Sequence, residues 1–363
     1  MAASGTGRHP LRRSSRTRDS DTVRPRLDWA ERTGHGRLGY VKSATDTAGH
    51  QPTNPTWRIP DPISTCEVQC AGQASIVVRQ HGNADAPLRL ILSHGNGLAI
   101  DLYYPFWSLL ADEFELIVYD LRNHGWNHPS AREHHNLPTM INDHDLVLEA
   151  VDRRYGEKTC VGVFHSLSTV IALLSFTQRY SGLLLVDPPL CKPGASDEDF
   201  DAATERAAAM TRSRHERYSA EEDFADMLEY LPSFARVLPG VRQLMARTTL
   251  RPTADNTGYE LRCPAELEAQ VIEYIRSFAP LLDLDTLYCP TKVIGADPTL
   301  PYTYLPSFDL SQIAAVQYDF VVDATHLVQM EKPEECVLML RDFLDRIGLL
   351  NLDSEPGAGT PRC

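Results

Sequence analysis

The chain has no long apolar segment. None of its 363 residues fall in a run that approaches the roughly 18 apolar residues of a membrane-spanning helix, and the first residues lack the apolar segment of a secretory signal. We therefore expect no stable membrane insertion. The predicted location is the cytoplasm, and import into an organelle through the Arg-rich N-terminus is the alternative.

Closely spaced cysteines are also missing. The eight cysteines form neither Cys-x-x-Cys pairs nor a dense disulfide pattern, so we expect reduced thiols. Three histidines, His134, His135 and His144, lie near Asp143 and Asp145, but their spacing matches no familiar set of metal ligands. We favour surface and capping roles for them over a metal site.

Positive charge is scarce outside the N-terminal segment. The net charge is −14, but residues 1–40 carry nine arginines and four acidic residues, which leaves −19 for the rest of the chain. An acidic surface repels phosphate backbones and anionic headgroups. Nucleic-acid binding is therefore not expected, and a neutral or cationic small molecule fits the charge better.

Residue patterns divide the chain into five parts. Residues 1–60 are rich in Arg, Ser, Thr, Gly and Pro without helical or strand periodicity, so we expect them to be disordered. From residue 66, apolar runs alternate with helical stretches, which predicts a mostly parallel sheet with helices on both faces. The eight predicted strands are Cys66–Ala71, Ser75–Gln80, Arg89–Ser93, Glu115–Tyr119, Thr159–Phe164, Leu183–Val186, Thr291–Ile294 and Gln317–Val322. The predicted helices between them are Leu102–Ala111, Met140–Tyr155, Leu167–Tyr180 and Pro333–Ile347.

About a hundred residues separate the strand that ends at Val186 from the strand that begins at Thr291. Their apolar positions recur at spacings of three and four, which predicts a helical lid inserted into the core. The expected parts after the N-terminal segment are residues 61–187 (first part of the core), 188–288 (lid), 289–350 (second part of the core) and 351–363 (flexible tail).

Two motifs follow strands in the first half. His94-Gly95-Asn96-Gly97 can turn tightly with its amides facing inward, unless the glycines only shape a loop. Phe164-His165-Ser166-Leu167-Ser168 ends a strand and opens a helix, the setting of a nucleophile elbow. We predict Ser166 as the nucleophile and the amides of Asn96 and Leu167 as the oxyanion hole; the alternative role of Ser166 is a helix N-cap.

An acid and a histidine follow strands in the second half. Asp297 and His326 complete the chain order Ser, Asp, His that this type of site uses. A histidine can accept the serine proton and return it, and a carboxylate behind it fixes its tautomer. We prefer Asp297 as this acid because it follows a late strand; Asp187, 21 residues after Ser166, is the alternative.

Aromatic residues Tyr103, Tyr104 and Trp107 follow the glycine loop at helical spacing. Their spacing favours positions in the core. They are also the candidates for lining an acyl pocket.

From residue 66 to 348 the chain resembles the α/β-hydrolase superfamily, especially a lipase- and esterase-like branch that includes a fungal peroxisomal lipase and toxin-biosynthesis hydrolases. The matching text is His94-Gly95-Asn96-Gly97, Tyr119-Asp120-Leu121-Arg122-Asn123-His124-Gly125, His165-Ser166-Leu167, Val186-Asp187-Pro188 and Ala324-Thr325-His326. The resemblance implies the α/β-hydrolase fold and a serine hydrolase with neither a metal nor an organic cofactor. Phe164 and Ser168 stand where the family elbow has glycines.

The working hypothesis is a carboxylesterase- or lipase-like enzyme that cleaves an apolar acyl ester through an acyl-enzyme. A C–C or other acyl-bond hydrolase with the same triad, an acyltransferase, and a non-catalytic binding protein with this fold are the alternatives. The sequence leaves the physiological substrate and the oligomeric state open.

Overall fold

The computed structural model describes residues 56–190, 197–278, 281–282, 284–300 and 316–350. All of them belong to one compact unit, Thr53–Cys363. No helix among the described residues combines the length and the apolar character that crossing a bilayer requires. The predicted tail and most of the predicted N-terminal segment lie outside the described residues.

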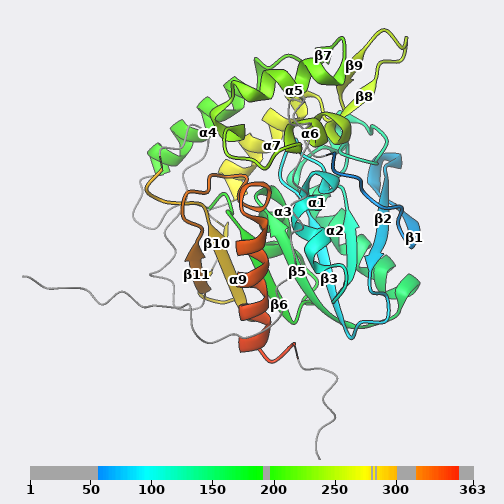
Figure 1. Ribbon diagram of the computed structural model, residues 1–363, viewed down its shortest axis with the longest axis vertical. Helices are drawn as coiled ribbons and strands as arrows, with labels where there is room; N and C mark the ends of the chain where they lie inside the picture. Colours follow the sequence, from blue (N-terminus) through cyan, green and yellow to red (C-terminus); the bar gives the residue numbers. More distant parts are fainter. Residues whose placement is uncertain (1–55, 191–196, 279–280, 283, 301–315, 351–363) are drawn as a thin grey trace, which may run out of the picture. The chain divides into compact units, whose positions relative to one another are not determined.

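An eight-stranded sheet forms the centre of the fold (Figure 1), in the order β1-β2-β4-β3-β5-β6-β10-β11. The strands are β1 Ser64–Gln69, β2 Ser75–Gly82, β3 Leu88–Ser93, β4 Glu115–Tyr119, β5 Thr159–His165, β6 Gly182–Val186, β10 Thr291–Gly295 and β11 Val316–Phe320. Strand β2 pairs antiparallel with β1 and β4, and the other pairs are parallel. The prediction of eight strands in a mostly parallel sheet is confirmed.

Apolar side chains from both faces of the sheet explain this arrangement. Every residue of β3, β4, β6 and β10 is buried, as expected for strands covered on two sides. Because side chains alternate along a strand, Leu90 packs into one cluster with Phe343, whereas Ile91 packs into a second cluster with Val170. The sheet therefore has two cores, one on each face.

Helices cover these two faces (Figure 1). Helices α1 (Tyr104–Trp107) and α9 (Pro333–Arg346) contact each other on one face, and α2 (Leu137–Tyr155) contacts α3 (Leu167–Leu173) on the other. Helix α3 ends seven residues earlier than predicted. The hydroxyls of Ser175 and Thr177 both donate to Asp145 of α2, and these bonds favour a turn over another turn of helix.

The described part of the insertion between β6 and β10 contains four α-helices and a small sheet (Figure 1). Its elements are α4 Asp197–Arg212, β7 Arg217–Tyr218, α5 Glu221–Glu229, α6 Val241–Thr249, β8 Leu250–Pro252, β9 Tyr259–Leu261 and α7 Ala265–Phe278. The prediction of a helical insertion missed the sheet β7-β9-β8, because strands of two or three residues are too short to show periodicity. A further short helix, α8 (Val328–Glu331), follows the β11 turn.

Residues 56–60 differ from the predicted disorder. The indole N–H of Trp57 donates to the carbonyl oxygen of Pro239, and Arg247 donates to the carbonyl oxygen of Trp57. The chain entering β1 is therefore bound to the loop before α6 and to α6 itself.

Candidate active site

Ser166 lies in a sharp turn between β5 and α3. Its backbone angles, φ 51° and ψ −118°, are uncommon for a residue with a side chain. Its backbone N–H donates to the carbonyl oxygen of Val186 at 3.0 Å, which fixes the turn to the neighbouring strand β6. A strained serine between a strand and a helix is the geometry of a nucleophile elbow.

Phe164 fits into this elbow because Gly162 leaves room for its ring. A Cβ atom added to Gly162 would lie 2.4 Å from Cε2 of Phe164. The buried ring makes edge contacts with His144 and Tyr180, at centroid distances of 5.5 and 5.7 Å. The bulky side chain at an elbow position is therefore accommodated in the cluster on the face of the sheet that also contains Ile91.

Ser168 occupies the second position where a glycine is usual. Its hydroxyl donates to the carbonyl oxygen of His165 and accepts from the N–H of His165, both at 3.0 Å. The side chain thus closes the elbow turn with two local hydrogen bonds.

His326 lies between a serine and an aspartate. Its Nε2 is 3.1 Å from Oγ of Ser166, and its Nδ1 is 2.6 Å from Oδ2 of Asp187. These contacts favour the tautomer in which Nδ1 carries the proton and donates a hydrogen bond to the carboxylate. Nε2 can then accept the serine proton.

The acid beside His326 is Asp187 and not the preferred Asp297. Asp297 uses Oδ1 to accept from the N–H and the hydroxyl of Thr299, and Oδ2 to accept from the N–H of Asp323 at 2.9 Å. These hydrogen bonds, the Thr299 hydroxyl first, lower the pKa of Asp297. The structure thus places Asp297 in the turn that leads to His326. We therefore assign the role of the triad acid to Asp187, the alternative that the sequence offered.

The glycine loop passes directly over the nucleophile. A Cβ atom on Gly95 would lie 3.1 Å from Cβ of Ser166, closer than ordinary packing allows. Gly97, with φ +71°, donates its N–H to Nε2 of His124 at 3.1 Å. The predicted oxyanion donors are the backbone N–H groups of Asn96 and Leu167. Within the described residues, neither group donates a hydrogen bond to another backbone group. Both remain available to a ligand.

The side chain of Asn96 connects this loop to the insertion. Its Nδ2 donates to the carbonyl oxygen of Glu268 in α7 at 2.8 Å. The Glu268 carboxylate is buried against Gly97 and is paired with Arg214, and burial raises its pKa. Helix α7 therefore helps to position the loop.

Tyr103, a predicted pocket residue, connects the glycine loop, the elbow and the His326 segment through hydrogen bonds. Its hydroxyl accepts from the N–H of Gly95 at 3.0 Å and lies 2.6 Å from Nδ1 of His165. Nε2 of His165 in turn lies 2.8 Å from the carbonyl oxygen of His326. Burial, followed by the neighbouring His326, holds the pKa of His165 well below its usual value, so this imidazole is neutral. The sequence did not indicate this role for Tyr103 or for His165.

The other two predicted pocket residues belong mainly to the core. Trp107 is 1% exposed and donates its indole N–H to the carbonyl oxygen of Ile100. Tyr104 packs edge-on against Trp107 and Trp57. These contacts agree with the core positions that their spacing favoured, and a role as acyl-pocket lining stays a prediction.

The histidines near Asp143 make separate contacts. His144 lies between the hydroxyls of Tyr119 and Tyr180, His135 contacts Asn123, and Asp143 pairs with Arg122. No group of three or more potential metal ligands occurs in the described ranges.

Comparisons with known proteins agree with this architecture. A sequence model for an alpha/beta hydrolase family matches residues 90–337. No curated protein sequence matches the chain.

Several solved structures share the fold. An E-2-(acetamidomethylene)succinate hydrolase is 17% identical, with a TM-score of 0.62 over 78% of this chain and 99% of that one. A thermophilic esterase from Thermogutta terrifontis is 20% identical, with a TM-score of 0.54 over 78% and 99%. The peroxisomal alpha-beta-hydrolase of Saccharomyces cerevisiae is 16% identical, with a TM-score of 0.57 over 83% and 91%. At these identities the likeness shows the fold alone.

Proposed function

The chain belongs to the alpha/beta hydrolase family, and we propose that it cleaves a carboxylic ester or related acyl bond of a small molecule through an acyl-enzyme on Ser166. The observation that carries this proposal is the hydrogen-bonded series from Ser166 Oγ through His326 to Asp187. A serine that merely capped a helix would not need such a series, and the Ser166 side chain makes no capping hydrogen bond to α3.

The first half of the reaction transfers the acyl group. Oγ of Ser166 attacks the carbonyl carbon while its proton moves to Nε2 of His326, 3.1 Å away. Asp187 stabilises the imidazolium that forms and keeps its tautomer. The imidazolium then gives its proton to the departing alcohol, which leaves the acyl group on the serine.

Water completes the cycle in the second half. His326 removes a proton from a water molecule that attacks the acyl carbon, and then returns a proton to Oγ of Ser166. In both halves the carbonyl oxygen becomes an anion. The amides of Asn96 and Leu167 supply its hydrogen bonds, and the N-terminus of α3 adds a favourable dipole.

The same triad can serve a C–C hydrolase, so the substrate class needs its own test. The full chain is assayed with p-nitrophenyl esters from acetate to palmitate and, in parallel, with a β-diketone that releases an acid on C–C cleavage. We expect turnover of at least one ester, and a loss of about a thousandfold or more in Ser166→Ala with an unchanged melting temperature. Cleavage of the diketone without turnover of any ester would favour the C–C hydrolase. Folded protein without either activity would favour a non-catalytic member of the family.

A further inference from the structure

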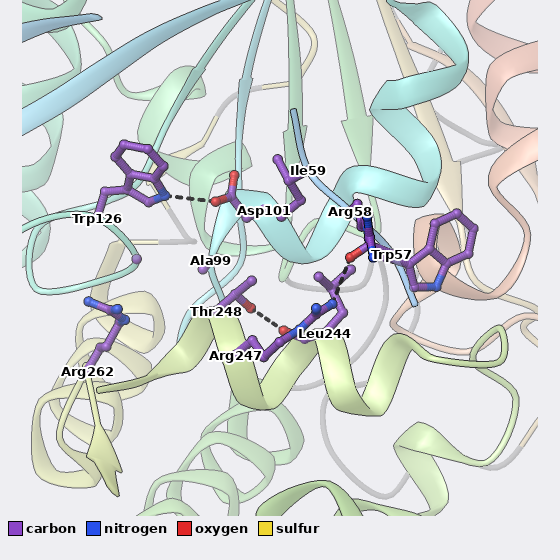
Figure 2. Close-up of a pocket in the computed structure, with 11 residues that line it drawn as sticks. Trp57, Arg58, Ile59, Ala99, Asp101, Trp126, Leu244, Arg247, Thr248 and Arg262 are labelled. Atoms are coloured by element: carbon purple, nitrogen blue, oxygen red, sulfur yellow. Dashed lines mark hydrogen bonds between the residues drawn. The ribbon is translucent and has the colours of Figure 1, made fainter. Parts of the chain in front are cut away.

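A cavity lies apart from the triad. It encloses about 410 Å³ and is bounded by the chain around Trp57, the turn at Asp101, the loop at Trp126, and α6 (Figure 2). Ser166, Asp187 and His326 are not among the residues that line it. This volume is within the range of sites that hold small organic molecules.

Three arginines line this cavity in a chain whose net charge is −14: Arg58, Arg247 and Arg262. In the described ranges, none of the three forms an ion pair with a carboxylate. Arg247 donates to the carbonyl oxygen of Trp57, but Nε of Arg262 is buried without a hydrogen-bond partner among the described residues. A partly buried guanidinium that pairs with no carboxylate favours binding of an anion.

The carboxylate in the cavity wall is already paired. Asp101 accepts from Arg79 at 2.6 Å through Oδ1 and from the indole N–H of Trp126 at 2.8 Å through Oδ2, as Figure 2 shows for the second bond. Asp101 therefore positions Trp126 and forms no ion pair with Arg262. Burial lowers the pKa of Arg262 and so does the charge of Arg251, against opposite effects of the carboxylates of Asp120, Asp101 and Glu221.

Two indole rings supply flat apolar surface beside these charges. The guanidinium of Arg79 lies 4.4 Å from the ring centroid of Trp126, and the Trp126 side chain is nevertheless 46% exposed. Trp57 is held on the other side by its bonds to Pro239 and Arg247, and Leu244 of α6 also lines the cavity. Both walls of the cavity are thus fixed before any ligand enters.

We propose that this cavity binds a small organic carboxylate with a flat apolar body. The carboxylate pairs with Arg262, and the apolar body lies against Trp126. A single negative charge suits the site better than the double charge of a phosphate ester, because the Asp101 carboxylate forms part of the wall.

Isothermal titration of the full chain with 2-naphthoate tests this inference, with 2-naphthylmethanol and 2-naphthyl phosphate as comparison ligands. We expect one saturable site for the carboxylate and affinities at least about tenfold weaker for the other two ligands. Arg262→Gln should weaken naphthoate binding at least about tenfold, and Arg262→Lys, which keeps the charge but loses the fork of donors, should give an intermediate value.

Arg153→Gln is the matched control, because Arg153 is an exposed arginine of α2 whose ion pair is with Glu149 of the same helix. The affinity of Arg153→Gln for 2-naphthoate should equal that of the unmodified chain. Absence of saturable binding, equal binding of naphthylmethanol, tighter binding of the phosphate, or unchanged affinity in folded Arg262→Gln would overturn the proposal. If Arg262→Gln does not fold, an unchanged affinity in Arg262→Lys has the same consequence.

Discussion

Oδ2 of Asp187 lies 2.6 Å from Nδ1 of His326, although 139 residues separate the two in the chain. Asp187 directly follows β6, with φ 39°, and its Oδ1 accepts from the N–H of Ala296 just after β10. One oxygen thus anchors the carboxylate to the neighbouring strand while the other holds the imidazole. This division fixes the orientation of the histidine that faces Ser166.

Asp187→Asn should abolish most of the activity without unfolding the protein. The amide keeps the shape of the carboxylate but cannot support the same imidazole tautomer, which costs on the order of ten-thousandfold in turnover in a related triad. The measurement is kcat for the best ester substrate, with a thermal melt of each variant.

Asp297→Asn is the control for this variant, because Asp297 holds the turn before His326 through Thr299 and Asp323. It should lower the melting temperature while turnover stays within about tenfold of the unmodified chain. The opposite outcome, an inactive Asp297→Asn and an active Asp187→Asn, would restore the role that the sequence suggested for Asp297.

The position of the acid shows where prediction from sequence reaches its limit. All eight strands could be predicted, and the central ones most directly, because burial on both faces leaves runs of aliphatic residues in β3, β4 and β6. The two aspartates could not be distinguished in the same way, because β6 and β10 are adjacent parallel strands and both carboxylates lie at the same edge of the sheet. Thr299, two residues after Asp297, was a local signal that this side chain closes its own turn.

The role of Tyr103 could not be predicted for a different reason. A tyrosine at helical spacing looks the same in sequence whether its hydroxyl reaches solvent, a substrate or a buried partner. Its contact with His165 depends on β5 lying beside β3 in the sheet, and pairing of distant strands is not encoded locally. The short strands of the insertion were missed because periodicity needs more than three residues.

Tyr103→Phe should reduce both activity and stability. The change leaves the N–H of Gly95 and Nδ1 of His165 without their common partner, at a cost of about 1–3 kcal/mol in the free energy of unfolding. Because Gly95 precedes Asn96, whose amide we propose for the oxyanion hole, we expect kcat to fall about tenfold or more through loss of positioning.

Tyr119→Phe is the control that distinguishes loss of active-site positioning in Tyr103→Phe from a general loss of stability. Tyr119 also bonds a buried histidine, His144 at 2.6 Å, but it packs in the cluster that contains Ile91 and Val170. This variant should be destabilised to a similar extent and keep its kcat. Equal losses of kcat in both variants would show that Tyr103 acts only through general stability.

Gly162 and Phe164 should be energetically coupled. Gly162→Ala places a methyl group 2.4 Å from the Phe164 ring and should cost about 1–3 kcal/mol in unfolding free energy. Phe164→Ala should cost about 3–5 kcal/mol through the cavity it leaves. In urea unfolding, the double variant should lose less than the sum of the two by about 1 kcal/mol or more, whereas simple additivity would argue against this packing.

Acid should destabilise the fold through its buried histidines. Burial lowers the pKa of His94 and His144 from 6.5 to about 4, and that of His124 to about 3. The unfolded chain therefore takes up protons near pH 6.5 that the folded chain does not bind. This contribution to stability is complete only well above pH 6.5 and is lost progressively as the pH falls through 6.5 towards 4.

Urea unfolding at pH 7.5, 6.5 and 5.5 measures this effect before most carboxylates titrate. The free energy of unfolding should begin to decrease between pH 7.5 and 6.5 and decrease more steeply between pH 6.5 and 5.5, with a smaller total decrease in His144→Gln. If the free energy of unfolding stays constant down to pH 5.5, these imidazoles are not buried in their neutral form.

The central claim, that the series of bonds to His326 and Asp187 activates Ser166, is tested most directly by covalent labelling. A fluorophosphonate probe reacts with a serine whose proton is removed by a neighbouring base, and intact-mass analysis counts the adducts. We expect one adduct per chain, mapped by peptide analysis to Ser166, none on Ser166→Ala, and normal labelling of Ser175→Ala, which alters a serine just beyond α3. Folded protein that remains unlabelled, or Ser166→Ala that is labelled to the same extent as the unmodified chain, would contradict it.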